Sequence, residues 1–234
     1  LKNKFDVRRN QKNYNNEIGV PLTILGVESG VSSPFKWMRE IILAVYKIIF
    51  ARKYPEILVL EMGADKIGDI GYLTSFIKCR VGVLTAIGQI PVHVEFFRTP
   101  EQVAKEKGKL IKSLPADGFA ILNFDDERVK KTAGVSSARK IFFGFNEGAD
   151  LKASQTEIHL ENLENAYFSF RVDWQGKSAP FRLNNILGEH LIYSVLAAIA
   201  AGLVFKMNLV EISQALKDFC YPPGRMRLIK GIKN

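Results

Sequence analysis

The chain alternates between short, continuous apolar runs and longer segments whose apolar residues recur at helical spacing. A short run without alternation is typical of a strand in a parallel sheet that is buried on both faces. Four such runs lie at residues 57–60, 81–87, 119–123 and 140–145. Helical spacing marks residues 34–53, 69–79 and 99–114. This order predicts an α/β fold with a doubly wound, mostly parallel sheet.

The pattern changes after residue 154, where apolar and polar residues begin to alternate. Three segments alternate in this way, at residues 157–160, 167–172 and 180–183. They predict an antiparallel β extension, with a hairpin turn at Gln175-Gly176. Two helices are predicted to follow, at residues 189–205 and 209–219. Near the start of the chain, a further apolar strand is predicted at residues 22–25.

The longest apolar run, residues 41–50, is interrupted by Lys47. It is too short to span a bilayer, so no membrane insertion is expected. The helical stripe in this region consists of Trp37, Ile41, Ala44, Val45 and Ile48. Such a stripe predicts a helix buried in the core. Residues 1–16 are polar and basic, without the apolar stretch of a signal peptide.

Composition and charge narrow the class of protein. A hydrophobic content of 47% with 24% charged residues is ordinary for a soluble globular protein. The net charge is +9, yet the basic residues are spread along the chain without interleaved aromatic residues, so no nucleic acid partner is expected. A basic surface also suits anionic nucleotides. Cys79 and Cys220 form no ligand pattern and are interpreted as reduced thiols of a cytoplasmic protein.

Three candidate residues follow predicted strands, where ligands of doubly wound sheets bind. Glu61 ends an otherwise apolar strand, and its carboxylate could hold Mg²⁺ beside phosphates. The alternative is a glutamate that caps a helix or points to solvent. His93 is either a functional imidazole or an ordinary loop histidine. Asn123 closes the third strand, where a structural and a functional role are equally open.

Lys107 lies in the apolar stripe of the helix predicted at residues 99–114, four residues after Val103. One interpretation is that its stem covers apolar surface while its amine reaches solvent. The other is a partly desolvated lysine with a lowered pKa. A neutral amine of that kind can react with CO₂ to form a carbamate, an anion that binds metal. Spacing alone favours the first interpretation.

Four more polar residues lie at the ends of elements. Asn15 and Asn16 belong to a loop signal. His190 opens a helix whose amino end can receive anionic groups. Arg225 follows Pro-Pro-Gly and offers a fixed positive charge for phosphate. Each of the four is as readily structural as functional.

Seven segments together resemble the Mur ligase family. In chain order they are Asn15-Asn16-Glu17-Ile18-Gly19-Val20-Pro21-Leu22-Thr23, Glu61-Met62-Gly63-Ala64, His93-Val94-Glu95, Ala104-Lys105-Glu106-Lys107-Gly108, Leu122-Asn123-Phe124-Asp125-Asp126, Gly188-Glu189-His190 and Gly224-Arg225-Met226. They occur in the family's order and cover nearly the whole chain. The first two are typical of the branch that joins D-Ala-D-Ala to UDP-MurNAc-tripeptide.

The resemblance implies the central, P-loop-type ATP-binding domain of a cytoplasmic, monomeric ligase. In that chemistry, ATP phosphorylates the carboxylate of UDP-MurNAc-tripeptide, and the amine of D-Ala-D-Ala attacks the acyl phosphate. The resemblance implies that Glu61 holds the first of two Mg²⁺ ions, while His93 and a carbamate on Lys107 hold the second.

The resemblance also assigns roles in binding. It implies that Asn123, His190 and Arg225 face the nucleotide. It implies that Asn15 and Asn16 line the substrate cleft.

The sequence departs from the family in several places. No Gly-x-x-Gly-Lys-Thr phosphate loop is present, and Leu1 is predicted to lie at the end of a helix. Leu191 and Ser194 stand where the family usually has an amide residue and an Asn, two positions that bear on adenine contacts. Residues 1–234 are therefore expected to be a central domain truncated at its N-terminus and inactive by itself. The first strand and phosphate loop are expected to be missing, as are the N-terminal UDP-binding and C-terminal ligase domains.

Two alternatives remain beside this interpretation. One is another amino-acid ligase of the superfamily, of the folylpolyglutamate or cyanophycin type. The other is a non-catalytic nucleotide-binding relic that kept the fold.

Overall fold

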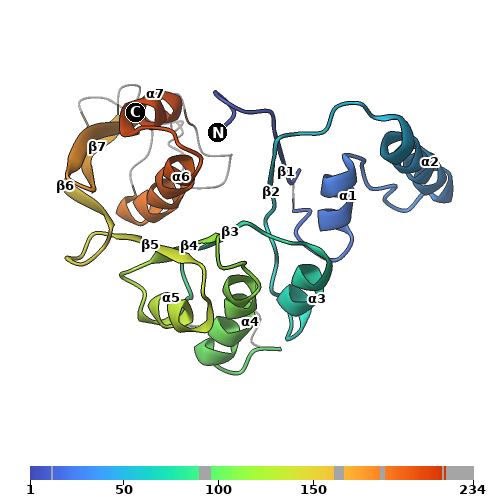
Figure 1. The fold of residues 1–234 in the computed structure, drawn as a ribbon, viewed down its shortest axis with the longest axis horizontal. Helices are drawn as coiled ribbons and strands as arrows, with labels where there is room; N and C mark the ends of the chain where they lie inside the picture. The colour runs from blue at the N-terminus through green and yellow to red at the C-terminus, as the bar shows by residue number, and fades with distance from the viewer. Residues whose placement is uncertain (12, 90–95, 161–165, 185–187, 218, 220–234) are drawn as a thin grey trace, which may run out of the picture. The chain divides into compact units, whose positions relative to one another are not determined.

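The computed structural model describes residues 1–234 apart from residues 12, 90–95, 161–165, 185–187, 218 and 220–234. The chain divides into two compact units, which Figure 1 shows in ribbon form. The first unit contains residues 1–77 and 90–109, and the second contains residues 78–89 and 110–234. In the described part of the chain, no helix is both long and apolar enough to cross a membrane.

The first unit contains a pair of parallel strands and several helices. Residues 2–4 form a turn where the end of a helix was predicted, and strand β1 (Val7–Arg9) then pairs with β2 (Ile57–Val59). The helices are α1 (Gly19–Leu25), α2 (Pro34–Phe50), α3 (Asp69–Phe76) and most of α4 (Pro100–Lys112). Side chains at most 2% exposed form the core of this unit: Val20, Ile70, Leu73 and Phe97.

The prediction of a strand at residues 22–25 is wrong, because this segment belongs to helix α1. A short apolar run does not distinguish a strand from a buried helical turn. Local hydrogen bonds decide the outcome here. The side-chain oxygen of Asn16 accepts the N–H of Gly19 at 2.8 Å, where the helix begins. Gly26 ends the helix in the left-handed conformation, with φ +68°, which glycine adopts at little cost.

The prediction that residues 34–53 form a core helix is half right. Helix α2 forms, with Ser33 as its N-cap and Pro34 in its first turn. Of the five residues in the predicted core stripe, however, only Ala44 is buried. Ile48 is 70% exposed. Helical spacing identifies the apolar side of a helix, but it does not say whether another element covers that side.

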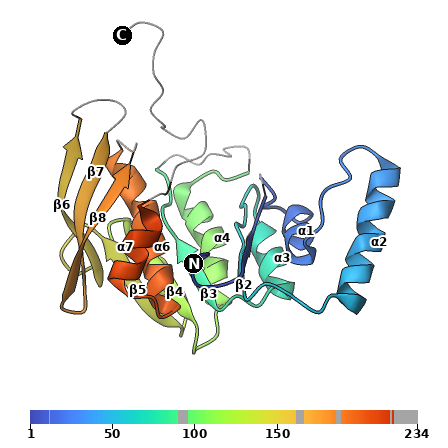
Figure 2. The same cartoon turned by 90° about the horizontal axis from the view of Figure 1, so that it is seen from above.

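The second unit contains a six-stranded sheet with the order β3-β4-β5-β6-β7-β8 (Figure 2). Its strands are β3 (Val81–Leu84), β4 (Phe119–Asn123), β5 (Arg139–Gly144), β6 (Leu151–His159), β7 (Tyr167–Trp174) and β8 (Lys177–Asn184). The pairs from β3 to β6 are parallel, and the pairs from β6 to β8 are antiparallel. The predicted mostly parallel sheet with an antiparallel extension is confirmed.

Helix α6 (Ile192–Val204) packs on β4 and β5 and completes the core of the second unit. The side chains of Ile121, Phe143 and Ile192 are fully buried there. The remaining helical elements are α5 (Glu127–Lys131), α7 (Leu209–Leu216) and the 3₁₀ turns η1 (Thr132–Val135) and η2 (Glu189–Leu191). The helix predicted at residues 189–205 is thus divided between η2 and α6.

The hairpin turn between β7 and β8 forms at Gln175-Gly176, as predicted. Both residues have positive φ angles, +47° and +75°, which match the twist of the flanking strands. Cys79 is half-buried in the same unit, and burial raises the pKa of its thiol. Cys220 lies outside the described residues.

Candidate functional site

Glu61 lies directly beyond β2 and is held there by two asparagines. Its backbone N–H donates to the side-chain oxygen of Asn10 at 2.6 Å, and the Asn10 amide donates back to the Glu61 carbonyl at 3.3 Å. The Asn15 amide donates to the Glu61 carboxylate at 3.2 Å. Two residues that the sequence assigned to metal and to substrate, Glu61 and Asn15, are therefore direct neighbours.

Gly63 brings the segment after Glu61 close to the same asparagine. Its N–H donates to the backbone carbonyl of Asn15 at 2.7 Å. A Cβ atom at position 63 would lie 3.3 Å from three atoms of Asn15, which is tighter than ordinary contact. The glycine of the Glu-Met-Gly-Ala motif therefore permits a close approach between two loops. This approach keeps Asn15 within reach of the Glu61 carboxylate.

A cavity of about 280 Å³ lies beside this cluster, within the first unit. Its walls include Asn16, Gly63 and Tyr72. The Asp69 carboxylate shapes one wall, because it accepts the N–H groups of Asp65 and Lys66 at 3.0 and 2.8 Å. Charged side chains of both signs and the apolar side chains of Ile67 and Leu73 thus line this hollow together.

Asn16 has a structural contact in addition to its place in the cavity wall. Its side-chain oxygen accepts the N–H groups of Ile18 and Gly19 at the start of α1. The side chain is solvent-exposed. Its amide oxygen is therefore already engaged by the backbone, which leaves the amide nitrogen as the group that can face a ligand.

Glu106 is a buried carboxylate that the sequence analysis did not single out. It is 2% exposed and accepts the N–H groups of Ile70 and Gly71, at 3.0 and 3.4 Å, in the first turn of α3. Lys109 pairs with it at 2.6 Å. Burial raises its pKa, but hydrogen bonds from Lys109 and from backbone N–H groups outweigh burial and hold the pKa below its usual range. Glu106 therefore fixes α4 to the N-terminus of α3.

The three predicted metal ligands are not all within the described residues. Lys107 is half-buried on α4, directly after Glu106. His93 lies outside the described residues, as does Arg225. Where the structure is described, no group of three His, Cys, Asp or Glu side chains is placed to hold a metal ion. The predicted convergence of Glu61, His93 and Lys107 stays a prediction.

Asn123 joins two strand ends in the second unit. It is 4% exposed, and its amide donates to the Thr85 carbonyl at 2.8 Å while its side-chain oxygen accepts the Asp125 N–H at 2.9 Å. Nearby in the chain, Asp126 caps α5, and its carboxylate also accepts the N–H of Ile87 at 2.7 Å. The predicted nucleotide residue is thus a buried connector of the carboxyl ends of β3 and β4.

His190 is exposed on η2 and lies over a glycine. A Cβ atom at Gly188 would lie 2.7 Å from the imidazole carbon Cε1. The Gly-x-His spacing therefore has a steric reason in this structure. The predicted nucleotide contact of His190 stays a prediction.

Asn10 is the residue of the Glu61 cluster that sequence reasoning missed. It follows β1, whose sequence Val-Arg-Arg contains a single apolar residue and therefore gives no strand signal. Without a predicted strand, nothing marked its carboxyl end as a ligand-facing position. Glu106 was missed for a related reason, since a carboxylate on a helix of low apolar content is typical of solvated surface.

Residues 39–202 match the Mur ligase middle domain, and the chain belongs to the Mur ligase family. The match includes Glu61 and Lys107, whereas Asn10 and Asn15 precede it. The cluster at the end of β2 therefore joins a segment inside the matched range to a segment outside it.

Individual relatives are similar over different parts of the chain. A UDP-N-acetylmuramoyl-tripeptide–D-alanyl-D-alanine ligase of Bacillus subtilis is 26% identical over 98% of this chain and 42% of its own length. A UDP-N-acetylmuramate–L-alanine ligase of Clostridium acetobutylicum is 29% identical over 61% of this chain and 30% of its own. The chain thus spans less than half the length of either relative.

A solved structure shares the fold. The MurF ligase of Thermotoga maritima in complex with ADP matches with a TM-score of 0.75 and 24% identity, over 98% of this chain and 46% of that one. At this identity the likeness establishes the fold alone.

Proposed function

We propose that the full-length protein carrying this chain is an ATP-dependent, ADP-forming ligase that adds D-Ala-D-Ala to UDP-MurNAc-tripeptide. The Bacillus subtilis relative with that name matches along 98% of this chain, which is the observation that carries the proposal. The reaction transfers the γ-phosphoryl group of ATP to a carboxylate, which gives an acyl phosphate and ADP. An amine then attacks the acyl carbon, and phosphate leaves as the amide forms. ADP bound to the Thermotoga maritima relative supports a nucleotide as the phosphoryl donor.

The Glu61 cluster is the part of the chain best suited to the anionic chemistry of this reaction. Glu61 is solvent-exposed, and Asn15 orients one of its oxygens. Among the described residues, no lysine or arginine forms an ion pair with Glu61. Its negative charge is therefore available to a cationic ligand.

The donor set at this position fits Mg²⁺, which prefers carboxylate and carbonyl oxygens. Glu61 would hold the ion through its carboxylate, and Asn15 would fix the direction of that carboxylate. When bound, Mg²⁺ neutralises phosphate oxygens and aligns them for in-line transfer. Asn10 keeps the Glu61 backbone in place through its pair of hydrogen bonds.

Our proposal includes a second Mg²⁺ held by His93 and by Lys107 as its carbamate. The half-buried position of Lys107 supports this role, because partial burial favours an amine that reacts with CO₂. The adjacent Glu106 supports it as well, since its contacts with α3 and Lys109 fix the turn of α4 that carries Lys107.

The remaining residues of the sequence analysis belong to the nucleotide and to the substrate. We assign Asn123, His190 and Arg225 to the nucleotide, and Asn15 and Asn16 to UDP-MurNAc-tripeptide. The buried Asn123 acts by keeping the ends of β3 and β4 together. The exposed amide of Asn16, in the wall of the cavity, can donate to a substrate oxygen. We propose a monomeric, cytoplasmic enzyme without a nucleic acid partner.

A second candidate is addition of L-alanine to UDP-N-acetylmuramate. The Clostridium acetobutylicum relative favours it, because its identity of 29% is higher than the 26% of the Bacillus subtilis relative. That likeness extends over a shorter part of this chain, 61% against 98%. We therefore place it second.

A paired assay separates the two candidates. Purified full-length protein is given ATP and Mg²⁺ with either UDP-MurNAc-tripeptide and D-Ala-D-Ala or UDP-N-acetylmuramate and L-alanine. Phosphate release and the mass of the product are then measured. We expect product only from the first pair, whereas product only from the second pair supports the alternative. Absence of turnover with both pairs contradicts the proposal.

A further inference from the structure

Helix α2 presents its apolar side to solvent. Its apolar residues follow the spacing i, i+3, i+4, i+7, and each is between 48% and 70% exposed. We call this set the apolar stripe: Met38, Ile41, Ile42, Val45, Ile48 and Ile49. In a surface helix of a globular protein, such a stripe ordinarily faces the core. In α2, by contrast, the apolar side faces solvent.

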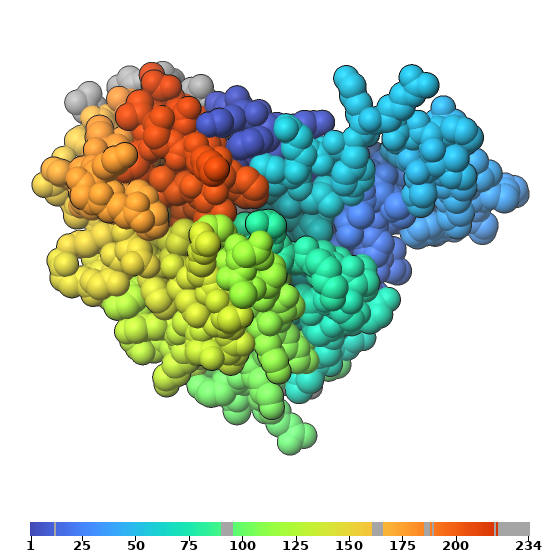
Figure 3. All heavy atoms as spheres, viewed as in Figure 1, coloured from blue at the N-terminus to red at the C-terminus, as the bar shows by residue number. Residues whose placement is uncertain are grey.

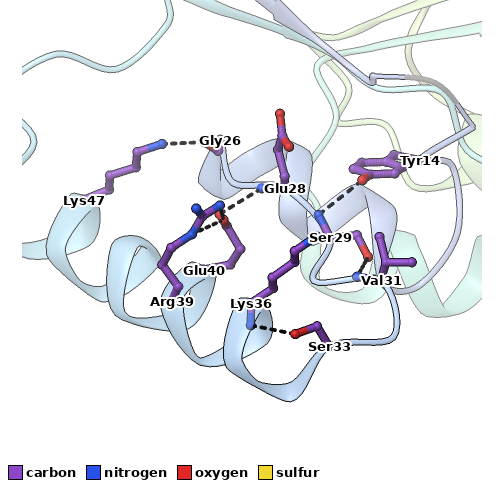
Figure 4. A network of polar contacts seen from close by, with 10 residues as sticks. All are labelled: Tyr14, Gly26, Glu28, Ser29, Val31, Ser33, Lys36, Arg39, Glu40 and Lys47. Atoms are coloured by element: carbon purple, nitrogen blue, oxygen red, sulfur yellow. Dashed lines mark hydrogen bonds and ion pairs between the residues drawn. The ribbon is translucent and has the colours of Figure 1, made fainter.

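Polar contacts on the opposite side of α2 fix this orientation (Figure 4). Glu40 is only 5% exposed, accepts the N–H of Glu28 at 3.2 Å and pairs with Arg39 at 2.6 Å. The ammonium group of Lys47 donates to the carbonyl of Gly26. These contacts tie the polar side of α2 to the segment after α1. The helix cannot rotate its apolar stripe inward without breaking them.

Positive charge accompanies the apolar stripe. The basic residues of α2 and of the segment just after it are all solvent-exposed: Lys36, Arg39, Lys47, Arg52 and Lys53. The one acidic residue of the same segment is Glu40, which is buried and paired. Lys36, Arg39 and Lys47 extend toward the segment after α1, on the side opposite the apolar stripe (Figure 4), so the positive charge beside the outward surface comes from Arg52 and Lys53, just after the helix. The outward surface of residues 34–53 shows no carboxylate. Figure 3 shows this segment, in blue and light blue, at the surface of the molecule.

We propose that α2 binds the surface of a bilayer that contains anionic phospholipid. The apolar stripe enters the boundary between headgroups and acyl chains, and the exposed Arg52 and Lys53 contact lipid phosphates. Phe35 and Tyr46, 80% and 59% exposed, add aromatic rings of the kind that favour this boundary. With 17 residues, α2 is roughly 25 Å long and lies in the plane of the surface.

Charge favours a lipid surface over a second copy of the chain. A symmetric contact between two copies places the same surface on both sides. Arg52 and Lys53 of one copy would then meet no carboxylate on α2 of the other, because Glu40 is buried and paired. Anionic phospholipid supplies the missing negative charge. The observations therefore favour the bilayer.

Vesicle co-sedimentation with the full-length protein tests the proposal. Vesicles of phosphatidylcholine alone are compared with vesicles in which about one third of the lipid is phosphatidylglycerol. We expect binding to the anionic vesicles, at least about tenfold weaker binding to the neutral ones, and progressive release by salt. Equal binding to both vesicles at all salt concentrations, or no binding to either, overturns the proposal.

Substitutions on the apolar stripe locate the contact. Ile42→Glu and Ile49→Glu should each lower binding to anionic vesicles at least about tenfold. Val210→Glu on α7, at a residue that is 60% exposed, is the matched control and should bind unchanged. Ligase turnover without vesicles should be unchanged in all three variants. Unchanged vesicle binding of both stripe variants overturns the proposal.

A fluorescence measurement avoids any change to the stripe. The chain contains two tryptophans, and Trp174→Phe leaves Trp37 on α2 as the single reporter. Brominated acyl chains should quench Trp37 in anionic vesicles. Absence of quenching overturns the proposal. The protein could instead form a dimer in sedimentation equilibrium, become a monomer on Ile42→Glu substitution and fail to bind vesicles. That result would assign the apolar stripe to a contact with a second copy of the chain, and it would also overturn the proposal.

Discussion

Three hydrogen-bonded residues determine what the end of β2 can do. Asn10 holds the backbone of Glu61, and Asn15 holds its carboxylate. The carboxylate is thereby oriented without being neutralised by a basic side chain among the described residues. A carboxylate that binds a cation must be held in position and must also keep its negative charge, and Glu61 meets both conditions.

Glu61→Gln tests the role of this carboxylate. The amide oxygen of glutamine still accepts from Asn15, so the fold should be kept, but the negative charge is lost. We expect kcat of the full-length ligase to fall roughly 100-fold. Asn15→Ala should lower kcat roughly tenfold, because it removes the contact that orients the Glu61 carboxylate but keeps the negative charge.

Steady-state kinetics over a range of Mg²⁺ concentrations measure both effects, with thermal unfolding as a check on the fold. Glu157→Gln, at an exposed carboxylate of β6, serves as the matched control. If Glu61→Gln and Glu157→Gln have the same kcat, the metal role of Glu61 is wrong.

Glu106→Gln tests the buried contact between α4 and α3. The variant loses the charge that pairs with Lys109, and we expect the free energy of unfolding to fall by about 1 kcal/mol at neutral pH. Glu127→Gln is the matched control, because Glu127 forms the same i,i+3 pair with Lys130 while its side chain is 72% exposed. That substitution should change stability by less than about 0.5 kcal/mol.

The pH dependence follows from the direction of the pKa. Because folding lowers the pKa of Glu106, its stabilisation is complete above the ordinary glutamate pKa of about 4.3. It is lost as the pH falls from there through the lower pKa of the folded state. The difference between the unsubstituted protein and Glu106→Gln should therefore shrink below about pH 4.3. Urea unfolding at several pH values measures it, and a constant difference contradicts the interpretation.

At the scale of elements, the sequence predicts strands best where the chain has a continuous apolar run. The runs that became β2, β3, β4 and β5 were located because they are continuously apolar, but only β4 is buried along nearly its whole length, and Val59 of β2 is 45% exposed. Prediction failed for β1, which has one apolar residue, and for α1, whose apolar run is too short to separate helix from strand. In α2 the period was right, but the covering of its apolar side was not.

Gly26→Ala tests why residues 22–25 form a helix. Alanine at φ +68° is strained, and its Cβ would lie 2.7 Å from the guanidinium of Arg8. We expect a loss of about 1–2 kcal/mol in the free energy of unfolding. Gly134→Ala is the control, because a Cβ there meets no atom within 4 Å. Chemical denaturation measures both, and equal effects would show that the left-handed end of α1 is unimportant.

At the scale of the whole molecule, the site signals are divided between two compact units. Glu61, Asn15 and Lys107 belong to the first unit, and Asn123 and His190 belong to the second. The family resemblance located both sets in the sequence, because its motifs mark strand ends and helix starts in either unit. It gave no role to Asn10 or Glu106, whose backbone partners are distant in sequence and meet them only on folding.

This division predicts that each unit has its own core and its own stability. Leu73 is 1% exposed in the first unit, and Ile121 is fully buried in the second. Replacing either by alanine leaves a cavity and should cost about 2–5 kcal/mol. We expect hydrogen exchange to quicken mainly in α3 for Leu73→Ala and mainly in β3, β4 and β5 for Ile121→Ala, since each core stabilises its own elements. Mass spectrometry of the exchanged peptides measures this pattern. If each variant quickened exchange equally in both units, the chain would unfold as one cooperative body despite its two cores.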